Sequence, residues 1–399
     1  MDAKMNEHTK TPSPRGDGQR ARDKLLFTPG PLTTSKTVKL AMLADLGSRD
    51  REFIDVIADV RRRLLAIGHA SPDRFGAILM QGAGTFGLEA VVGSAVPPER
   101  TLLVVVNGAY GRRLVSIAQR LGIETQTLEY AENRRPDPED VRRALASDPN
   151  ISMVSACHCE TTSGILNPIT EMGRAAHEAG RHFFVDAMSA YGAIDLDVEE
   201  GHVDFLCSSA NKCIEGVPGF SFIIARKEAL EQTEGSARSV ALDLHAQLRG
   251  LDSNGQFRFT PPVQTILAFH QALVELEQEG GVEARGARYR ANHETLLAGM
   301  RDLGFREYVP TEAQSPIITS FLYPSDERWD FERFYRLLSE EGHIIYPGKA
   351  GEAPCFRIGT IGRIYPADVR ALIGAIRRAL DSMGVDPAES LPEQSGGIV

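Results

Sequence analysis

Phe205-Leu-Cys-Ser-Ser-Ala-Asn-Lys-Cys213 is the most informative segment of the chain. An apolar run of strand type passes into small polar residues and then into Lys212. Because ligands of open α/β sheets bind beyond the carboxyl ends of the strands, a lysine at this point lies where a site is expected. A lysine after a strand is more often a solvated loop residue, so Lys212 alone does not decide between the two interpretations.

Strand-like and helix-like segments alternate on both sides of Lys212, and this alternation predicts a mainly parallel sheet covered by helices. The expected strands are 77–80, 102–106, 125–129, 151–156, 182–186, 205–209 and 219–225. Helical patterns separate most of them, at 56–67, 89–95, 112–121, 138–145 and 172–179. Two long amphipathic helices, 261–278 and 284–303, then lead out of the sheet. A smaller α+β unit follows, with strands 317–322, 343–346 and 356–359 and helices 331–341 and 367–383.

These elements predict an α/β chain of two domains, a large one over residues 25–280 and a small C-terminal one over residues 281–388. Residues 1–24 are polar and lack apolar periodicity, which predicts a disordered tail, and residues 389–399 are expected to form a flexible end. The length of 399 residues, with 42% hydrophobic and 25% charged residues, is typical of a globular enzyme.

The charge pattern and the cysteines argue against several classes of function. The net charge is −10 and the acidic residues are scattered, so nucleic acid is not an expected partner. No apolar run reaches the roughly 20 residues of a membrane span, and the first residues lack the apolar core of a signal peptide, so we expect a cytoplasmic protein without a membrane partner. The five cysteines have no Cys-x-x-Cys spacing, which predicts reduced thiols and no metal site.

Asp186 ends the apolar run that precedes the Lys212 strand. A buried carboxylate without a cationic partner is costly. The protonated pyridine nitrogen of pyridoxal 5'-phosphate (PLP) is such a partner, and its positive charge makes the cofactor an electron sink. The alternative is that Asp186 only caps the following turn.

The glycine-rich turn Gly82-Ala-Gly-Thr-Phe-Gly87 follows a short strand and opens a helix. Its backbone N–H groups and the helix dipole therefore form an anion site. The string also matches the dinucleotide fingerprint, but the next strand ends at Asn107 without an acidic residue to hold a ribose, so a single phosphate fits better. A turn that needs glycine only for its backbone geometry is the alternative.

Three further motifs lie at or near predicted strand ends. Tyr110, between glycines, is suited to stack on a planar ring, although a core tyrosine is equally common. The hydroxyls of His158-Cys-Glu-Thr-Thr-Ser-Gly164 are able to bond a phenolate oxygen or to cap the next helix. Arg357, in an apolar strand, is suited to clamp an acid group or to pair with a surface acid. Together these motifs provide a phosphate-binding turn, an aromatic ring, hydroxyls, a carboxylate and a lysine. This combination predicts a PLP enzyme in which Lys212 holds the cofactor as a Schiff base.

The chain from about residue 26 to residue 361 resembles the class V aminotransferases. The resemblance implies the aspartate-aminotransferase-like fold of PLP enzymes, fold type I. Within the class, it points to transfer of the amino group of 2-aminoethylphosphonate to pyruvate, giving phosphonoacetaldehyde and L-alanine. The strings that carry it are Thr28-Pro-Gly-Pro-Leu-Thr-Thr34, Gly47-Ser-Arg-Asp50, Asn107-Gly-Ala-Tyr-Gly111, His158-Cys-Glu-Thr-Thr-Ser-Gly164, Ser209-Ala-Asn-Lys-Cys213, Glu215-Gly-Val-Pro-Gly219 and Tyr346-Pro-Gly-Lys349.

The resemblance implies catalytic roles for Lys212, which holds the cofactor and moves a proton, and for Asp186, which pairs with the pyridinium nitrogen. Tyr110 matches the family's stacking aromatic residue. Thr161 matches a hydroxyl near the ring, with Thr162 a close second.

For the cofactor phosphate, the resemblance implies Gly84 and Thr85 in the glycine turn and Asn211 before the lysine. Thr260 matches a residue that reaches the phosphate of the neighbouring subunit, which implies a homodimer with shared active sites. Arg357 matches the arginine that holds the acid groups of both small-molecule substrates, and Arg49 is a weaker second candidate.

The chain departs from the family's pattern in the segment Leu244-His-Ala-Gln-Leu248, which lacks the expected aromatic residues, and at Val263-Gln264, where Thr-His is more usual. Both departures bear on substrate preference. The nearest alternative is therefore another class V transaminase, which uses alanine or serine with glyoxylate or pyruvate. A cysteine desulfurase fits less well because Asn211 stands before the lysine. From other classes, a nicotinamide-dependent oxidoreductase could use the Gly82–Gly87 turn, whereas a non-catalytic binding protein would have no need of Lys212.

Overall fold

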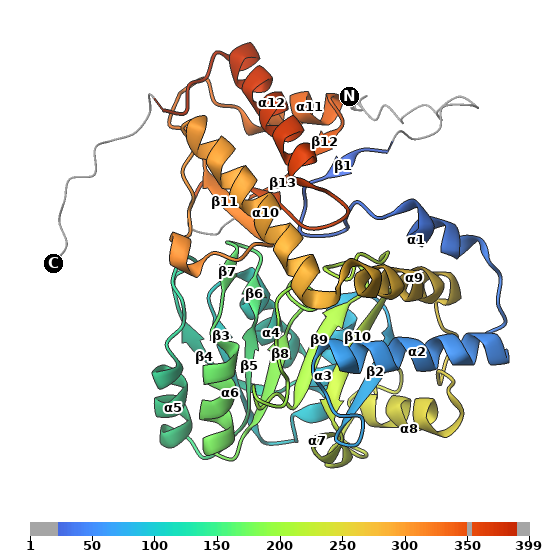
Figure 1. Ribbon diagram of the computed structural model, residues 1–399. Helices are drawn as coiled ribbons and strands as arrows, with labels where there is room; N and C mark the ends of the chain where they lie inside the picture. The colour runs from blue at the N-terminus through green and yellow to red at the C-terminus, as the bar shows by residue number, and fades with distance from the viewer. Residues whose placement is uncertain (1–22, 349–352, 389–399) are drawn as a thin grey trace, which may run out of the picture.

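The computed structural model describes residues 23–348 and 353–388. The predicted C-terminal flexible end and nearly all of the predicted N-terminal tail lie outside these residues. Figure 1 shows a large sheet with helices on both faces and a smaller unit above the carboxyl ends of its strands.

The large sheet has seven strands in the order β2-β10-β9-β8-β5-β3-β4. All neighbours are parallel except β10, which runs antiparallel to both β2 and β9. The mainly parallel sheet expected from the sequence is therefore confirmed. The strands are β2 (Phe75–Gln81), β3 (Thr101–Val106), β4 (Glu124–Glu129), β5 (Ile151–Cys157), β8 (His182–Asp186), β9 (Phe205–Ser209) and β10 (Phe220–Arg226).

Apolar runs without alternation explain why the strands lie inside, except the polar edge strand β4, which is partly exposed. Every residue of β3 is buried, as expected where helices cover both faces of a parallel sheet. In Figure 1, α2 and α6 lie in front of the sheet and α3 and α4 behind it. The helices of this part are α1 (Lys36–Leu40), α2 (Arg51–Ile67), α3 (Gly84–Ala95), α4 (Ala109–Arg120), α5 (Pro138–Ser147), α6 (Ile169–Glu178), α7 (Lys227–Glu231), α8 (Leu244–Asn254) and α9 (Val263–Glu279), with the 3-10 turn η1 (Ala41–Leu43).

The smaller unit has its own buried cluster, built around Phe305, Phe321, Phe334 and Phe356. Its three-stranded sheet has the order β11-β14-β13. The division into two domains at residue 280, expected from the sequence, stays a prediction. The elements of this unit are α10 (Gly281–Asp302), η2 (Thr311–Ala313), β11 (Ile318–Leu322), α11 (Phe331–Glu340), β12 (His343–Ile344), β13 (Tyr346–Pro347), β14 (Cys355–Gly359) and α12 (Pro366–Met383).

The first described strand, β1 (Leu25–Leu26), pairs with a strand of this unit although it precedes the large sheet in the sequence. It pairs in parallel with β12, and the Gly359 N–H donates to the Phe27 carbonyl at 3.0 Å. The chain then runs toward the large sheet before α1 begins. We call residues 27–34 the strap.

Several boundaries differ from the sequence-based expectation. Helix α3 begins at Gly84, five residues earlier than predicted, because the glycine turn itself forms its first turn. Helices α9 and α10 are separated only by Gly280, whose φ of +110° lies in the left-handed region. Helix α8 and the hairpin of β6 (Cys159–Glu160) with β7 (Ile165–Leu166) were not predicted.

Two further expectations concern whole-chain properties. All five cysteines are buried and none forms a disulfide bond with another, as expected for thiols in apolar surroundings. Among the helices of residues 23–348 and 353–388, none is long and apolar enough to cross a membrane.

Candidate active site

Lys212 lies in a tight turn directly after β9. The turn is closed by the Glu215 N–H, which donates to the Lys212 carbonyl at 2.7 Å, and by the Gly216 N–H, which donates to the Ala210 carbonyl at 3.0 Å. The lysine Nζ donates to the carbonyl of Pro29 in the strap at 2.8 Å. Burial lowers the pKa of the ammonium, against the charge of Asp186, which raises it. A neutral amine is the nucleophilic form, so the environment favours covalent chemistry at Nζ.

The strap touches Lys212 so closely that only glycine fits at position 30. Gly30 has a φ of +127°, and a Cβ there would lie 2.9 Å from the lysine Cδ and 3.0 Å from its Nζ. Pro29 and Gly30 were not among the predicted site residues. A signal was present, since a glycine between two prolines seldom serves flexibility alone.

Gly30→Ala should slow covalent attachment of PLP to the apoprotein by about a hundredfold, because a shift of about 1 Å at a reacting group has an effect of that size. Absorbance spectroscopy after mixing with PLP measures the rate. Gly235→Ala is the matched control, since Gly235 also has a positive φ, +75°, but no atom lies within 4 Å of its added Cβ. Attachment at the wild-type rate in Gly30→Ala would show that the contact does not position the amine.

Asp186 ends β8 and is only 3% exposed. Its Oδ1 accepts a hydrogen bond from the Met188 N–H at 3.0 Å, and the Cys157 thiol approaches its Oδ2 at 3.9 Å. Burial raises the pKa of the carboxyl to about 6, and the charge of Glu160 acts in the same direction. A charged carboxylate at such a buried position is stabilised by a neighbouring cation, and a protonated ring nitrogen is such a cation.

Asp186→Asn should therefore stabilise the cofactor-free protein at neutral pH. The raised pKa means that the folded state binds more protons than the unfolded state, so wild-type stability falls as the pH rises from about 4 through about 6. The shift from an ordinary value of 3.8 to about 6 corresponds to about 3 kcal/mol above that window. Urea unfolding of both proteins from pH 5 to pH 8 should show a gap that widens with pH.

Asp204→Asn provides the opposite control. Burial favours the neutral form of Asp204, but the hydrogen bond and charge of His182, the Phe183 N–H and the charge of Arg226 together outweigh burial and lower the pKa of the carboxyl. That variant should therefore lose stability above pH 4, where the wild-type Asp204 is charged. A gap for Asp186→Asn that stays constant with pH would contradict the assignment of a raised pKa to Asp186.

Glu160 is a buried carboxylate that the sequence analysis did not single out. It is fully buried, and its carboxylate accepts hydrogen bonds from the N–H groups of Tyr110 and Gly111, each at 3.2 Å. The Thr162 hydroxyl donates to it at 2.5 Å. Burial raises the pKa of Glu160, while these hydrogen bonds oppose the rise. The carboxylate thus anchors the first turn of α4, whose N–H groups and dipole favour negative charge, and so holds Tyr110 in place.

Gly108 makes this arrangement possible, since a Cβ there would lie 2.4 Å from the Glu160 Cδ. Both residues belong to strings that the sequence analysis quoted. An acidic residue among the small polar residues of the second string was the available signal.

The glycine turn and Tyr110 lie next to one another. The Arg113 guanidinium lies 4.6 Å from the centre of the Tyr110 ring and donates a long hydrogen bond, 3.4 Å, to the Thr85 hydroxyl. A Cβ on Gly84 would lie 2.6 Å from the Met188 Sδ, which places the start of α3 against the segment after Asp186. Helix α3 has no side-chain cap, so its first N–H groups are suited to an anion.

Arg357 comes from β14 and reaches the hydroxyl-rich string. Its Nη1 donates to the Thr161 carbonyl at 2.8 Å and its Nη2 to the Pro347 carbonyl at 3.0 Å. The guanidinium lies 4.8 Å from the centre of the Tyr346 ring, and the side chain is 8% exposed. Its buried Nε has no partner among the described residues. No ion pair of Arg357 with an acid occurs among those residues, so the surface-pair interpretation is not favoured.

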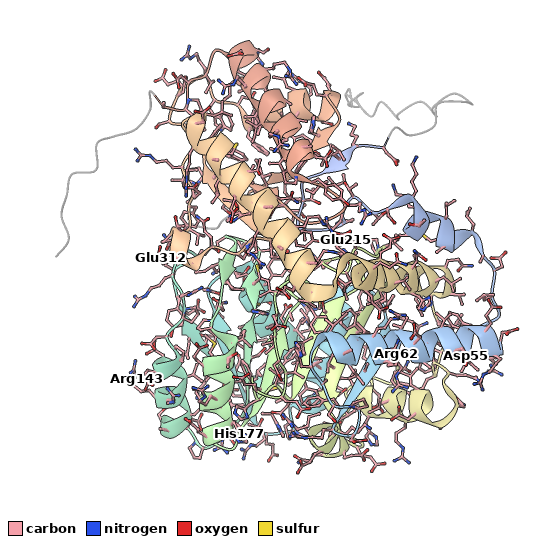
Figure 2. All side chains as sticks on the ribbon, viewed as in Figure 1. Asp55, Arg62, Arg143, His177, Glu215 and Glu312 are labelled. Atoms are coloured by element: carbon pink, nitrogen blue, oxygen red, sulfur yellow. The ribbon has the colours of Figure 1, made fainter. Side chains whose placement is uncertain are left out.

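The remaining predicted site residues have fewer contacts with the residues described so far. Asn211 is half-buried beside Lys212, and its carbonyl lies 3.0 Å from the Cβ position of Gly30. Thr260 is exposed on the loop between α8 and α9. Arg49 is exposed on the turn before α2, whose first turns, marked by Asp55 in Figure 2, extend away from the sheet. Their roles stay predictions.

Comparison with known proteins identifies the family. The profile described as Aminotransferase class-V matches residues 42–371. The chain is a class V aminotransferase. Its cofactor is accordingly PLP, and its substrates are small molecules.

Relatives with assigned names are also similar over almost their whole length. The 2-aminoethylphosphonate–pyruvate transaminases of Salmonella schwarzengrund and Salmonella typhimurium are each 49% identical over 362 residues, 90% of this chain and 98% of theirs.

Solved structures share the fold. The alanine–glyoxylate aminotransferase of Nostoc sp. has a TM-score of 0.84 at 25% identity, covering 91% of this chain and 96% of that one. The pyridoxamine–pyruvate aminotransferase of Mesorhizobium loti also has a TM-score of 0.84, at 24% identity, covering 92% and 96%. The aspartate-aminotransferase-like fold expected from the sequence is therefore confirmed.

The site fits PLP in its own chemistry. A buried carboxylate with no ion pair among the described residues, an amine with a lowered pKa and an uncapped helix terminus are suited to the ring nitrogen, the aldehyde and the phosphate of the cofactor, in that order. These groups come from Asp186, Lys212 and the Gly84–Thr85 turn.

Proposed function

We propose that this class V aminotransferase moves the amino group of 2-aminoethylphosphonate to pyruvate, giving phosphonoacetaldehyde and L-alanine. The observation that carries the proposal is the 49% identity, over 98% of their length, to transaminases with that name. The nearest alternative donors, alanine and serine with glyoxylate, would use the same cofactor residues, so the donor has to be tested directly.

Lys212 and Asp186 are the proposed catalytic residues. PLP, when bound, supplies an electron sink that stabilises negative charge at the substrate carbon next to nitrogen. Lys212, whose pKa is lowered, would hold the cofactor covalently through Nζ and would take and return the proton at that carbon. Asp186 keeps its charge when a cationic ring nitrogen faces it, and that charge holds the nitrogen proton in place.

The cofactor-binding residues are proposed as a set that surrounds Lys212. Tyr110 stacks on the ring, and its position is supported by the hydrogen bonds that the first turn of α4 donates to Glu160. The other residues of the set bind the ring oxygen or the phosphate; they are Gly84, Thr85, Thr161, Asn211 and, from the neighbouring subunit, Thr260.

The homodimer belongs to the same proposal. Thr260 is exposed in the single chain, as a residue needs to be if it is to reach a second subunit. The cytoplasmic location expected from the sequence stays a prediction.

Arg357 is the proposed clamp for substrate acid groups, with Arg49 as a second candidate. One site has to accept a phosphonate dianion in the first half-reaction and a carboxylate in the second. A planar guanidinium bonds either acid in a bidentate manner. The two carbonyls that Arg357 now bonds are weaker partners than an acid, and its Nε is available.

The donor assay tests the proposal. With PLP bound, the purified protein should have a higher kcat/KM for 2-aminoethylphosphonate than for serine when pyruvate is the acceptor. The value for 2-aminoethylphosphonate with pyruvate should also exceed that for alanine with glyoxylate. Both half-reactions are followed by the absorbance of the cofactor. A higher kcat/KM for serine or for alanine with glyoxylate would overturn the choice of donor and leave the aminotransferase assignment intact.

A further inference from the structure

A buried ionic cluster lies beneath the turn that carries Lys212, and the proposed reaction does not use it. The cluster consists of Glu215, Glu279, Arg285, Arg288 and Tyr289. Glu215 follows the lysine by three positions, and the others lie on α10 or just before it. Figure 2 marks Glu215 at the level where α10 meets the edge of the large sheet.

The cluster is deeply buried and balanced in charge. Arg285 and Tyr289 are 0% exposed and Glu215 is 3% exposed. Arg288 donates to Glu215 at 2.8 Å and to Glu279 at 2.7 Å, and Arg285 donates to Glu279 at 2.7 Å. Buried ion pairs of this kind add little stability over apolar packing, but they allow few alternative arrangements.

One side of the cluster holds the Lys212 turn. The Arg285 Nη1 donates to the Cys213 carbonyl at 2.6 Å, and the Tyr289 hydroxyl donates to Glu215 at 2.6 Å. Glu215 has a φ of +67°, a strained backbone conformation for a residue with a side chain. Its bonds to Arg288 and Tyr289 hold it there, and its own N–H closes the turn on Lys212.

The other side of the cluster holds the loop 362–364 of the smaller unit. The Arg288 Nη1 donates to the carbonyls of Gly362, at 2.5 Å, and Ile364, at 3.2 Å. The Gly362 N–H donates to the Tyr289 hydroxyl at 3.2 Å. The neighbouring Arg363 N–H donates to the Thr33 carbonyl in the strap at 2.7 Å.

A closed ring of contacts results. It runs from the Lys212 turn through the cluster to the loop 362–364, then to the strap, and back through the Pro29 carbonyl to the lysine Nζ. We propose that the ionic cluster positions Lys212 by fixing its turn relative to the strap that receives its amine. The inference rests on the proposed role of Lys212 and is independent of the identity of the donor.

The test uses Glu215→Gln and Arg285→Lys in the holoenzyme. Glu215→Gln keeps the shape and one acceptor but removes the charge. Arg285→Lys keeps the charge but replaces the two nitrogens that bond Glu279 and Cys213 with a single ammonium, which lacks the planar geometry of the guanidinium. Single-turnover rates with L-alanine should fall at least tenfold, while the apparent Kd for L-alanine stays within about twofold. L-[2-²H]alanine should give a larger isotope effect than in the wild type, because a misplaced lysine slows the proton transfer.

Arg301→Lys is the matched control, since Arg301 lies on the same helix in an exposed ion pair with Glu307 at 2.7 Å. Hydrogen–deuterium exchange of residues 210–216 in the apoprotein gives a second readout. Uptake should rise in the two cluster variants and stay unchanged in the control. If Arg285→Lys does not fold, Glu215→Gln carries the test.

Lower thermal stability with wild-type rates, isotope effect and deuterium uptake would overturn the inference and leave the cluster a purely structural feature. The proposed donor is judged separately. A wild-type enzyme that turns over L-alanine but not 2-aminoethylphosphonate would refute the donor, and the comparison of variants with L-alanine would stand. If the wild type used neither amine, the deuterium uptake of the apoproteins would still decide on the cluster.

Discussion

Replacing Lys212 with alanine should reduce turnover by about 10⁴-fold or more while leaving a folded protein. The variant loses both the amine that binds the cofactor and the group that moves the proton, and these two roles act as a unit. Little core packing is lost, because the side chain is only partly buried and its amine donates to a backbone carbonyl, that of Pro29. Initial rates with saturating pyruvate, together with a thermal unfolding curve, measure both parts of the prediction.

Lys227→Ala is the matched control. The Lys227 Nζ also donates to a proline carbonyl, that of Pro72, at 2.7 Å, but it lies at the start of α7 after β10. Its loss should leave turnover within about twofold of wild type, as expected of a surface substitution. A Lys212→Ala enzyme with a tenth of the wild-type activity would refute the catalytic role of this lysine.

Replacing Arg357 with alanine should lower kcat/KM about a hundredfold in both half-reactions. A charged, bidentate bond to an acid is lost in each, and the loss of such a bond typically amounts to a few kcal/mol. Arg357→Lys should recover only part of the activity, because an ammonium cannot form the planar pair. Stopped-flow measurements with 2-aminoethylphosphonate on one enzyme form and pyruvate on the other separate the two half-reactions.

Arg226→Ala controls for the loss of packing. The Arg226 guanidinium likewise lies over an aromatic ring, 4.8 Å from the centre of Phe75, but it bonds Asp204 at the far end of β10. That variant should lose stability while both half-reactions proceed normally. If Arg357→Ala slowed only the reaction with pyruvate, the phosphonate would be held by another group, and a shared clamp would be wrong.

The site residues that the sequence predicts most directly are those whose local context is unusual. Asp186 and Lys212 each follow an apolar strand, where a charged side chain stands out, and parallel strands bring such ends to one edge of the sheet. The class of fold was predictable for the same reason, because long apolar strands alternate with amphipathic helices over most of the chain.

The residues that the sequence analysis missed make contacts with residues far away in the sequence. Gly30 matters because it meets Lys212, and Glu160 matters because it meets the first turn of α4; neither contact shows in the residues next to them. Register and packing between distant segments decide such contacts, and periodicity within a segment does not report them. Thr260 and Arg49 are both exposed in the single chain. The role of Thr260 at the neighbouring subunit's phosphate and that of Arg49 as a second acid-binding candidate stay predictions.

The pairing of β1 with β12 has a consequence for the order of events during synthesis. Leu25 and Leu26 leave the ribosome early, but their partners His343 and Ile344 are among the last parts to be made. This pairing forms only after residue 344 has been made, and closing so long a loop costs conformational entropy at that late point. Pro29 lies three residues after β1, so we expect its carbonyl to be fixed beside the lysine amine only in an almost finished chain.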